Sequence, residues 1–146
     1  MIASMIAKRM VRSAIAMMNQ DDFDVDAFLA HWADDAVWDG TSELSVGETI
    51  KGKKAIADWF RRWKEEFPKR KFVVRNICFG AWPLSPTNVV IAQWSLTQTD
   101  KQGKEFKYDG VTVSHTRNMK IVQATEYISF AGLPQISTLI KPSGKA

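Results

Sequence analysis

The segment from Phe28 to Phe67 constrains the fold more than any other part of this chain, because three kinds of element follow one another closely in it. An apolar stripe at helical spacing predicts a helix that starts near Asp24 or Val25 and ends at Asp34-Asp35. A short strand, Ala36 to Asp39, comes next, and a strongly amphipathic helix is expected from about Lys53 to Phe67. Pro68 cannot continue that helix.

The second half of the chain has the composition and alternation of β-strands. The expected strands are Lys71 to Ala81, Val89 to Thr99, Glu105 to Arg117 and Ile121 to Phe130. The loop at 82–87 and tight turns at 100–103 and 118–120 separate them, while a further helix is expected from about Ser4 to Asn19. Helices followed by hairpin-linked strands predict an α+β fold, with three N-terminal helices on one face of a curved antiparallel sheet.

Length and charge favour one ordinary globular domain. The chain has 146 residues, 45% of them hydrophobic, and a formal net charge of +4. We expect a domain over residues 1–132 and a C-terminal tail over 133–146. Basic residues gather between Lys51 and Lys71, but Glu65 and Glu66 interrupt them and no nucleic-acid-binding motif is present. We therefore interpret them as a solvated helix face and expect no nucleic acid partner.

The N-terminus and the single cysteine are interpreted structurally. The first 20 residues lack acids and carry three basic side chains, which is typical of a targeting helix and also of a first core helix. Helical spacing of Met5 or Ile6, Met10, Ala14 and Met17 favours the core helix. With no 18-residue apolar run, we expect a cytoplasmic protein without a membrane partner. Cys78 is expected to be buried, and no metal-binding pattern accompanies His31 and His115.

The order of elements around Ala33-Asp34-Asp35-Ala36-Val37-Trp38-Asp39-Gly40 resembles the nuclear transport factor 2-like superfamily. It is most similar to the SnoaL-like polyketide cyclases and the ketosteroid isomerases of that superfamily. The resemblance implies a cone-shaped fold with a deep apolar pocket, and chemistry without a cofactor. Ser129 stands where related enzymes often have an acid, and Ala14 stands where the isomerases have a pocket tyrosine.

Candidate catalytic residues come from two places. Alternation puts Asp109, Val111, Val113 and His115 on one strand face, which the two valines predict to be buried. Burial would raise the pKa of a carboxyl and make it a useful base near neutrality. The alternative base is Asp39, which lies next to the position of the isomerases' catalytic carboxylate.

The remaining candidates would bind the substrate. Tyr127 or His115 is the expected hydrogen-bond partner of an enolate oxygen. The expected pocket lining is Trp38, Trp59, Trp63, Trp94, Val111, Val113 and Ser129.

Two functions remain open from the sequence. One is an isomerase, cyclase or dehydratase that acts on a small hydrophobic molecule through a carboxylate general acid or base. The other is a non-catalytic module that binds a hydrophobic ligand or another protein. We also expect a homodimer formed through the sheet, because the Val89–Thr99 strand has apolar groups on both faces.

Overall fold

The computed structural model describes residues 2–40, 49–81 and 87–129. Most of the loop expected at 82–87 lies outside these residues. The tail expected at 133–146 lies entirely outside them.

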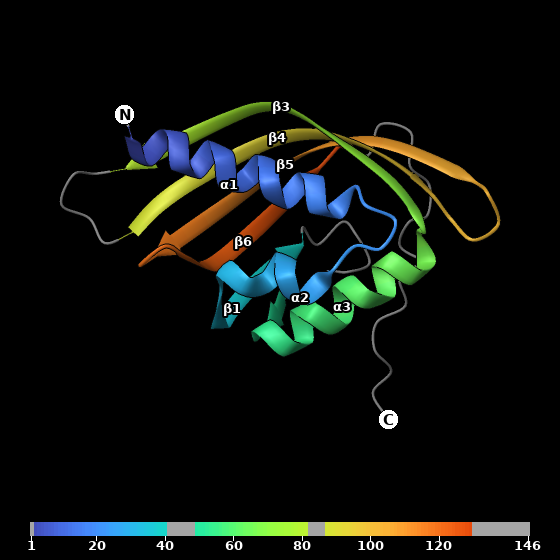
Figure 1. The fold of residues 1–146 in the computed structure, drawn as a ribbon, viewed down its shortest axis with the longest axis horizontal. Coiled ribbons are helices and arrows are strands. Elements are labelled where there is room, and N and C mark those ends of the chain that lie inside the picture. The colour runs from blue at the N-terminus through green and yellow to red at the C-terminus, as the bar shows by residue number, and fades with distance from the viewer. Residues whose placement is uncertain (1, 41–48, 82–86, 130–146) are drawn as a thin grey trace.

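A six-stranded curved sheet forms the body of the molecule (Figure 1). Its strand order is β2-β1-β6-β5-β4-β3. The strands are β1 (Trp32–Gly40), β2 (Thr49–Lys51), β3 (Lys69–Ala81), β4 (Thr87–Thr99), β5 (Glu105–Arg117) and β6 (Lys120–Ile128). Neighbours pair antiparallel except β1 and β6, which are parallel. The α+β prediction is confirmed, and one parallel pair corrects the expectation of a purely antiparallel sheet.

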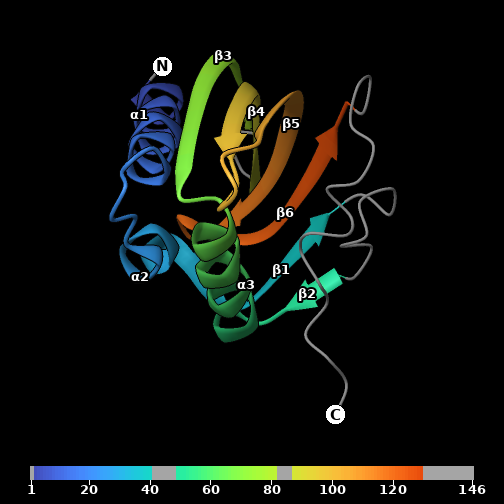
Figure 2. The ribbon, with the colours of Figure 1, turned by 90° about the vertical axis from the view of Figure 1, so that its right-hand side faces the viewer.

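The helices lie against one side of this sheet, as Figure 2 shows. They are α1 (Ile2–Met18), α2 (Val25–Phe28), which continues as a 3-10 turn over Leu29–His31, and α3 (Lys53–Glu66). Asp24 caps α2 by accepting a hydrogen bond from the Ala27 N–H at 3.0 Å, as its side chain predicts. The second helix ends earlier than expected, because Trp32 is already extended and begins β1.

Burial along β4 defines the two faces of the sheet. Val90, Ala92, Trp94, Leu96 and Gln98 are buried and their neighbours along the strand are more exposed. We call the side to which these residues point the inner face, and the opposite side the outer face. The pairing register carries the inner face across the sheet to Phe106, Tyr108, Gly110, Thr112 and Ser114 of β5, then to Ala124, Glu126 and Ile128 of β6, and to Trp38 and Gly40 of β1.

Aromatic side chains fill the space between α3 and the inner face. Trp59, Phe60 and Trp63 of α3 are buried, as the helical spacing predicts. The ring of Trp59 contacts that of Trp38 with centroids 4.3 Å apart, and Phe60 packs edge-on against Phe28 at 5.1 Å. This aromatic packing fixes α3 over β1.

Three smaller expectations are wrong. Cys78 is exposed because it pairs with Ile91 on the outer face. Met5 and Ile6 are exposed at the start of α1.

The third concerns Arg70, which is buried although it stands in the basic cluster. Its guanidinium donates to the carbonyls of Met18, Phe67 and Gln20 and so joins the ends of α1 and α3.

A buried carboxyl on the inner face

The predicted catalytic residues all lie on the outer face. Asp109 is exposed and accepts a hydrogen bond of 2.5 Å from Ser95 Oγ. His115 and Tyr127 are exposed as well. Asp39 is half-buried but pairs with Thr125 and accepts from Thr49 Oγ1 at 3.0 Å, which places it opposite the inner face. The expectation that Asp109 and His115 point into the interior is wrong.

The error has a single physical cause, which is the choice of face on β5. Val111 and Val113 are only half-buried and belong to the outer face with Asp109. The inner positions between them are Gly110 and Thr112, whose small side chains gave no apolar signal in the sequence. Neighbouring residues of a strand point to opposite faces of the sheet. Choosing the wrong face therefore misplaced Asp109, Val111, Val113 and His115 together.

The expected pocket lining divides in the same way. Trp38, Trp59, Trp63 and Trp94 are buried on the inner side of the sheet. Ser129 is exposed, and its backbone N–H donates to the Asp109 carbonyl at 2.9 Å. The four tryptophans therefore lie on the inner side of the sheet, whereas Val111, Val113 and Ser129 lie on its outer side.

Glu126 is the carboxyl that the inner face presents within the described residues. It lies on β6 between Ala124 and Ile128, opposite Thr112 of β5 and Gly40 of β1. The Trp38 side chain is hydrogen-bonded to it. Thr112 Oγ1 donates to Glu126 Oε1 over a long contact of 3.5 Å. Both Thr112 and Trp38 therefore act as hydrogen-bond donors to this carboxyl.

Burial controls the acidity of this group. Loss of water around the charged form raises the pKa of Glu126 from its ordinary value of 4.5 to about 7. The hydrogen bonds from Thr112 and Trp38 act in the opposite direction, because they stabilise the carboxylate. Near neutral pH both protonation states are therefore populated, which suits a group that takes up and returns a proton.

Tyr108 is the second polar group near Glu126. It is half-buried on the inner face, and its pKa is raised by burial and by the charge of Glu126. Its ring lies 6.1 Å from that of Trp94. Within the described residues its hydroxyl has no hydrogen-bond partner. A neutral phenol of this kind can donate a hydrogen bond to an oxygen of a bound molecule.

Sequence reasoning missed Glu126 and Tyr108 although one signal was present. Ala124, Glu126 and Ile128 alternate with the outward-facing Thr125 and Tyr127, and a carboxyl between two apolar residues at a spacing of two marks an inward-facing position.

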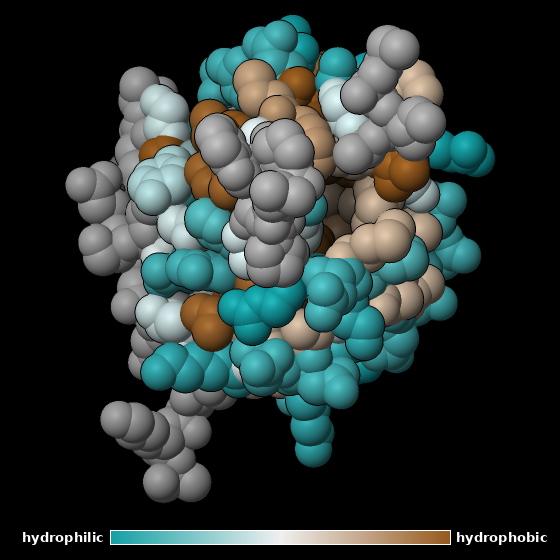
Figure 3. All heavy atoms as spheres, turned by 90° about the vertical axis from the view of Figure 1, so that its left-hand side faces the viewer, coloured by the Kyte–Doolittle hydropathy of each residue, from teal (hydrophilic) through white to brown (hydrophobic). Residues whose placement is uncertain are grey.

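Several polar and apolar residues of the inner face keep some exposure to solvent. Tyr108, Thr112, Glu126 and Ile128 are only half-buried. Figure 3 shows apolar side chains, in brown and tan, around a recess on the side from which α1 starts.

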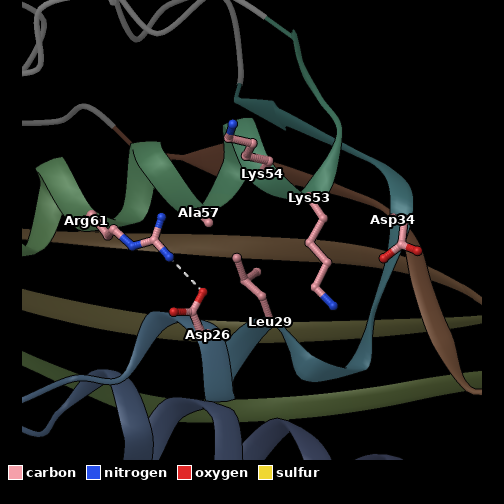
Figure 4. Close-up of a pocket in the computed structure, with 7 residues that line it drawn as sticks. All are labelled: Asp26, Leu29, Asp34, Lys53, Lys54, Ala57 and Arg61. Carbon is pink, nitrogen blue, oxygen red and sulfur yellow. Dashed lines mark hydrogen bonds and ion pairs between the residues drawn. The ribbon is translucent and has the colours of Figure 1, made fainter.

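A pocket of about 380 Å³ lies on the surface between α2 and α3 (Figure 4). Its lining is Asp26, Leu29, Asp34, Lys53, Lys54, Ala57 and Arg61. Arg61 crosses one side of it in an ion pair with Asp26 at 2.7 Å, and also pairs with Asp58 at 3.0 Å. Five of its seven lining residues are charged, so this pocket lacks the apolar surroundings of Glu126.

Comparison with known proteins identifies the family. The model of the SnoaL-like domain matches residues 11–124. The chain belongs to the SnoaL-like domain family. No curated protein matches this SnoaL-like chain.

Solved structures share its fold, which is the nuclear transport factor 2-like fold. A proposed isomerase from Bacillus subtilis has a TM-score of 0.67 at 21% identity, with 84% of this chain and 86% of that chain covered. A protein of unknown function from Burkholderia pseudomallei, described as NTF2-like, has a TM-score of 0.65 at 17% identity, with coverage of 86% and 92%. A proposed SnoaL-like polyketide cyclase from a Jannaschia species has a TM-score of 0.63 at 12% identity, with coverage of 84% and 87%.

Two further findings concern the described residues only. No helix among them is both long and apolar enough to cross a membrane. They also hold no group of three or more His, Cys, Asp or Glu side chains placed to bind a metal ion.

Proposed function

We propose that this SnoaL-like protein is an enzyme that moves a proton on a small hydrophobic molecule, with Glu126 as the general base and acid. One observation carries the proposal. Within the described residues, Glu126 is the carboxyl of the inner face, and it lies among buried tryptophans while two side chains hold it by hydrogen bonds.

The chemistry that fits is enolisation of a carbonyl compound. Glu126 takes a proton from the carbon next to the carbonyl group, so the C–H bond breaks and its electron pair moves onto the carbonyl oxygen. Tyr108 donates a hydrogen bond to that oxygen as it becomes negative. Glu126 then returns its proton to another atom of the same molecule, which completes an isomerisation or, after bond formation within the substrate, a cyclisation.

The comparisons support this class of reaction without naming a substrate. The Bacillus subtilis and Jannaschia proteins are described as a proposed isomerase and a proposed polyketide cyclase. Trp38, Trp59 and Trp94 present flat apolar surfaces, which favours a ring-containing ketone over a charged or extended substrate.

Proton exchange tests the proposal before any product is known. The protein is incubated in D₂O with a panel of aromatic and alicyclic ketones, and deuterium uptake is followed by mass spectrometry. Glu126→Gln keeps the shape of the side chain and should slow uptake by a factor of about 10²–10⁴. Tyr108→Phe should slow it by roughly 10²-fold, as loss of one oxyanion donor does.

Asp109→Asn and Asp39→Asn are the matched controls, because both remove a carboxylate from the outer face. Both should retain wild-type uptake. Uptake that survives Glu126→Gln contradicts the proposal. Binding of a ketone, detected by quenching of tryptophan fluorescence, without uptake by the wild type would favour the alternative function of a hydrophobic-ligand-binding module.

We also propose that two copies pair through the outer face. This face carries Val73, Ile91 and Tyr127, with exposed fractions of 40%, 37% and 54%, beside the half-buried Val111 and Val113. Apolar groups in such number are poorly explained by contact with water alone. Sedimentation should give a dimer for the wild type and a monomer for Ile91→Asp, whereas a wild-type monomer at tens of micromolar contradicts the pairing.

A further inference from the structure

We infer that Thr112, oriented by Trp94, is a positioning residue that holds Glu126 as a proton acceptor and leaves its second oxygen for the ligand. The inference deepens the proposed function and rests on it for its catalytic meaning. It is carried by a chain of contacts from β4 through β5 to β6.

Chemistry fixes the direction in which the indole groups of this chain of contacts act, and that direction leaves the Thr112 hydroxyl able to donate. The Trp94 indole N–H can only donate, and it donates to Thr112 Oγ1 at 2.9 Å. Thr112 Oγ1 therefore accepts from Trp94 and directs its own hydrogen toward Glu126 Oε1, at 3.5 Å. The indole N–H of Trp38, also a donor only, is the polar group through which its side chain bonds Glu126.

Donors on one side of a carboxyl decide where its proton can sit. While Thr112 and Trp38 donate to Glu126, each presents a hydrogen to the carboxyl, so a proton on Glu126 is disfavoured on their side. In that arrangement the acidic proton lies on the side away from these two residues. We place the ligand on that side, so Glu126 exchanges its proton with the ligand and not with its own supports.

Gly110 makes the position of Trp94 available. The residues are opposite each other in the β4–β5 register, and a Cβ at Gly110 would overlap the six-membered ring of Trp94. The indole can therefore lie flat across β5 and reach Thr112, which is the next inner residue of that strand. Any side chain at this position would lift the ring and break the contact with Thr112.

Among the described residues, few other groups can influence the proton on Glu126. β1 brings Trp38, α3 brings the Trp59 ring against Trp38, and β5 brings Thr112 and Tyr108. Tyr108 is the titratable one among these. Asp39 on β1 and Asp109 on β5 lie on the outer face, and the α3 side chains Arg61 and Asp58 are paired with each other at the molecular surface.

Direct titration of Glu126 tests the inference without a substrate. The full chain is labelled with ¹³C at glutamate carboxyls, and Glu126→Gln assigns the resonance by its loss. Thr112→Val keeps the shape but removes the donor, so the titration midpoint should move above that of the wild type. Thr112→Ser restores the hydroxyl and should restore the midpoint. Trp94→Phe leaves Thr112 in place but frees its hydroxyl to turn, so the midpoint should move upward by less, and this variant serves if Thr112→Val does not fold.

The outcomes separate the inference from the proposed function. A wild-type midpoint in Thr112→Val, or no recovery in Thr112→Ser, overturns the inference. In ketone exchange, Thr112→Val should lower kcat with KM nearly unchanged and move the pH profile upward with the midpoint. Exchange that survives Glu126→Gln overturns the proposed function, whereas the midpoint in Thr112→Val alone decides whether Thr112 positions the carboxyl.

Discussion

Two hydroxyl–carboxyl pairs flank β5, one on each face of the sheet, and they differ in almost every respect. On the outer face Ser95 donates to Asp109 over 2.5 Å, and Arg75 Nε donates to Ser95 at 3.0 Å. On the inner face Thr112 reaches Glu126 only at 3.5 Å. The shorter contact is the one in water, where a hydrogen bond exchanges with water at little net gain. The longer one lies among tryptophans, where the charge of Glu126 is costly and its pKa rises. Environment, and not contact distance, distinguishes the candidate site.

The largest expected effect compares adjacent residues on opposite faces of β3. Arg70→Ala leaves the carbonyls of Met18, Gln20 and Phe67 without their donor, and should lower the free energy of unfolding by roughly 3 kcal/mol or more. Lys71→Ala, on the exposed side, should change it by less than about 0.5 kcal/mol. Urea denaturation measures both. Equal values would show that the two faces are not energetically distinct at this end of the sheet.

The second effect is the pH dependence that Glu126 imposes on stability. Its pKa is raised from 4.5 to about 7 in the folded state, so the folded protein holds this proton more tightly than the unfolded chain. The stabilisation from the proton is complete below pH 4.5 and is lost as pH rises through about 7. As pH rises between these limits, the free energy of unfolding of Glu126→Gln should increase relative to that of the wild type. The difference should reach about 3 kcal/mol above pH 7, because each pKa unit corresponds to 1.36 kcal/mol.

Urea denaturation from pH 4 to 9 gives this difference, and other ionisable groups cancel because both chains contain them. A difference between the two chains that does not vary with pH would mean that water reaches Glu126 freely.

The third effect compares two strand glycines. Gly110→Ala forces the Trp94 ring away and should cost about 1–3 kcal/mol, with a shift in tryptophan fluorescence. Gly80→Ala is the control on the outer face, where the nearest atom to a new Cβ is the Val89 carbonyl oxygen at 3.9 Å, and it should be near neutral. Equal costs would contradict the close packing of Trp94 over β5.

The smallest effect concerns the outer pair. Ser95→Ala should change the free energy of unfolding by less than about 0.5 kcal/mol, since Asp109 is exposed and water replaces the lost donor. A larger loss of unfolding free energy, one that grows with protein concentration, would contradict this expectation. It would mean that a second copy covers the outer face.

Much of the fold could be predicted because its signals are local. The spacing of Trp59, Phe60 and Trp63 predicts α3 and its buried face. The turn at Gly103, with φ of 84°, and the bounds of β5 follow from nearby residues. The three-residue β2 and the parallel pairing of β1 with β6 could not be predicted in this way, because they depend on segments far apart in the chain.

The sequence by itself determined that a SnoaL-like α+β cone forms, with a tryptophan-rich interior, since periodicity and residue order are properties of the chain. Only the tertiary structure decided which carboxyl lies in that interior. Strand alternation offers two faces, and β5 carries apolar residues on one and a glycine that admits Trp94 on the other. The choice between them depends on which face α3 covers, and that contact brings together residues remote in sequence. Tertiary packing therefore placed Glu126 inside and left Asp39 and Asp109 outside.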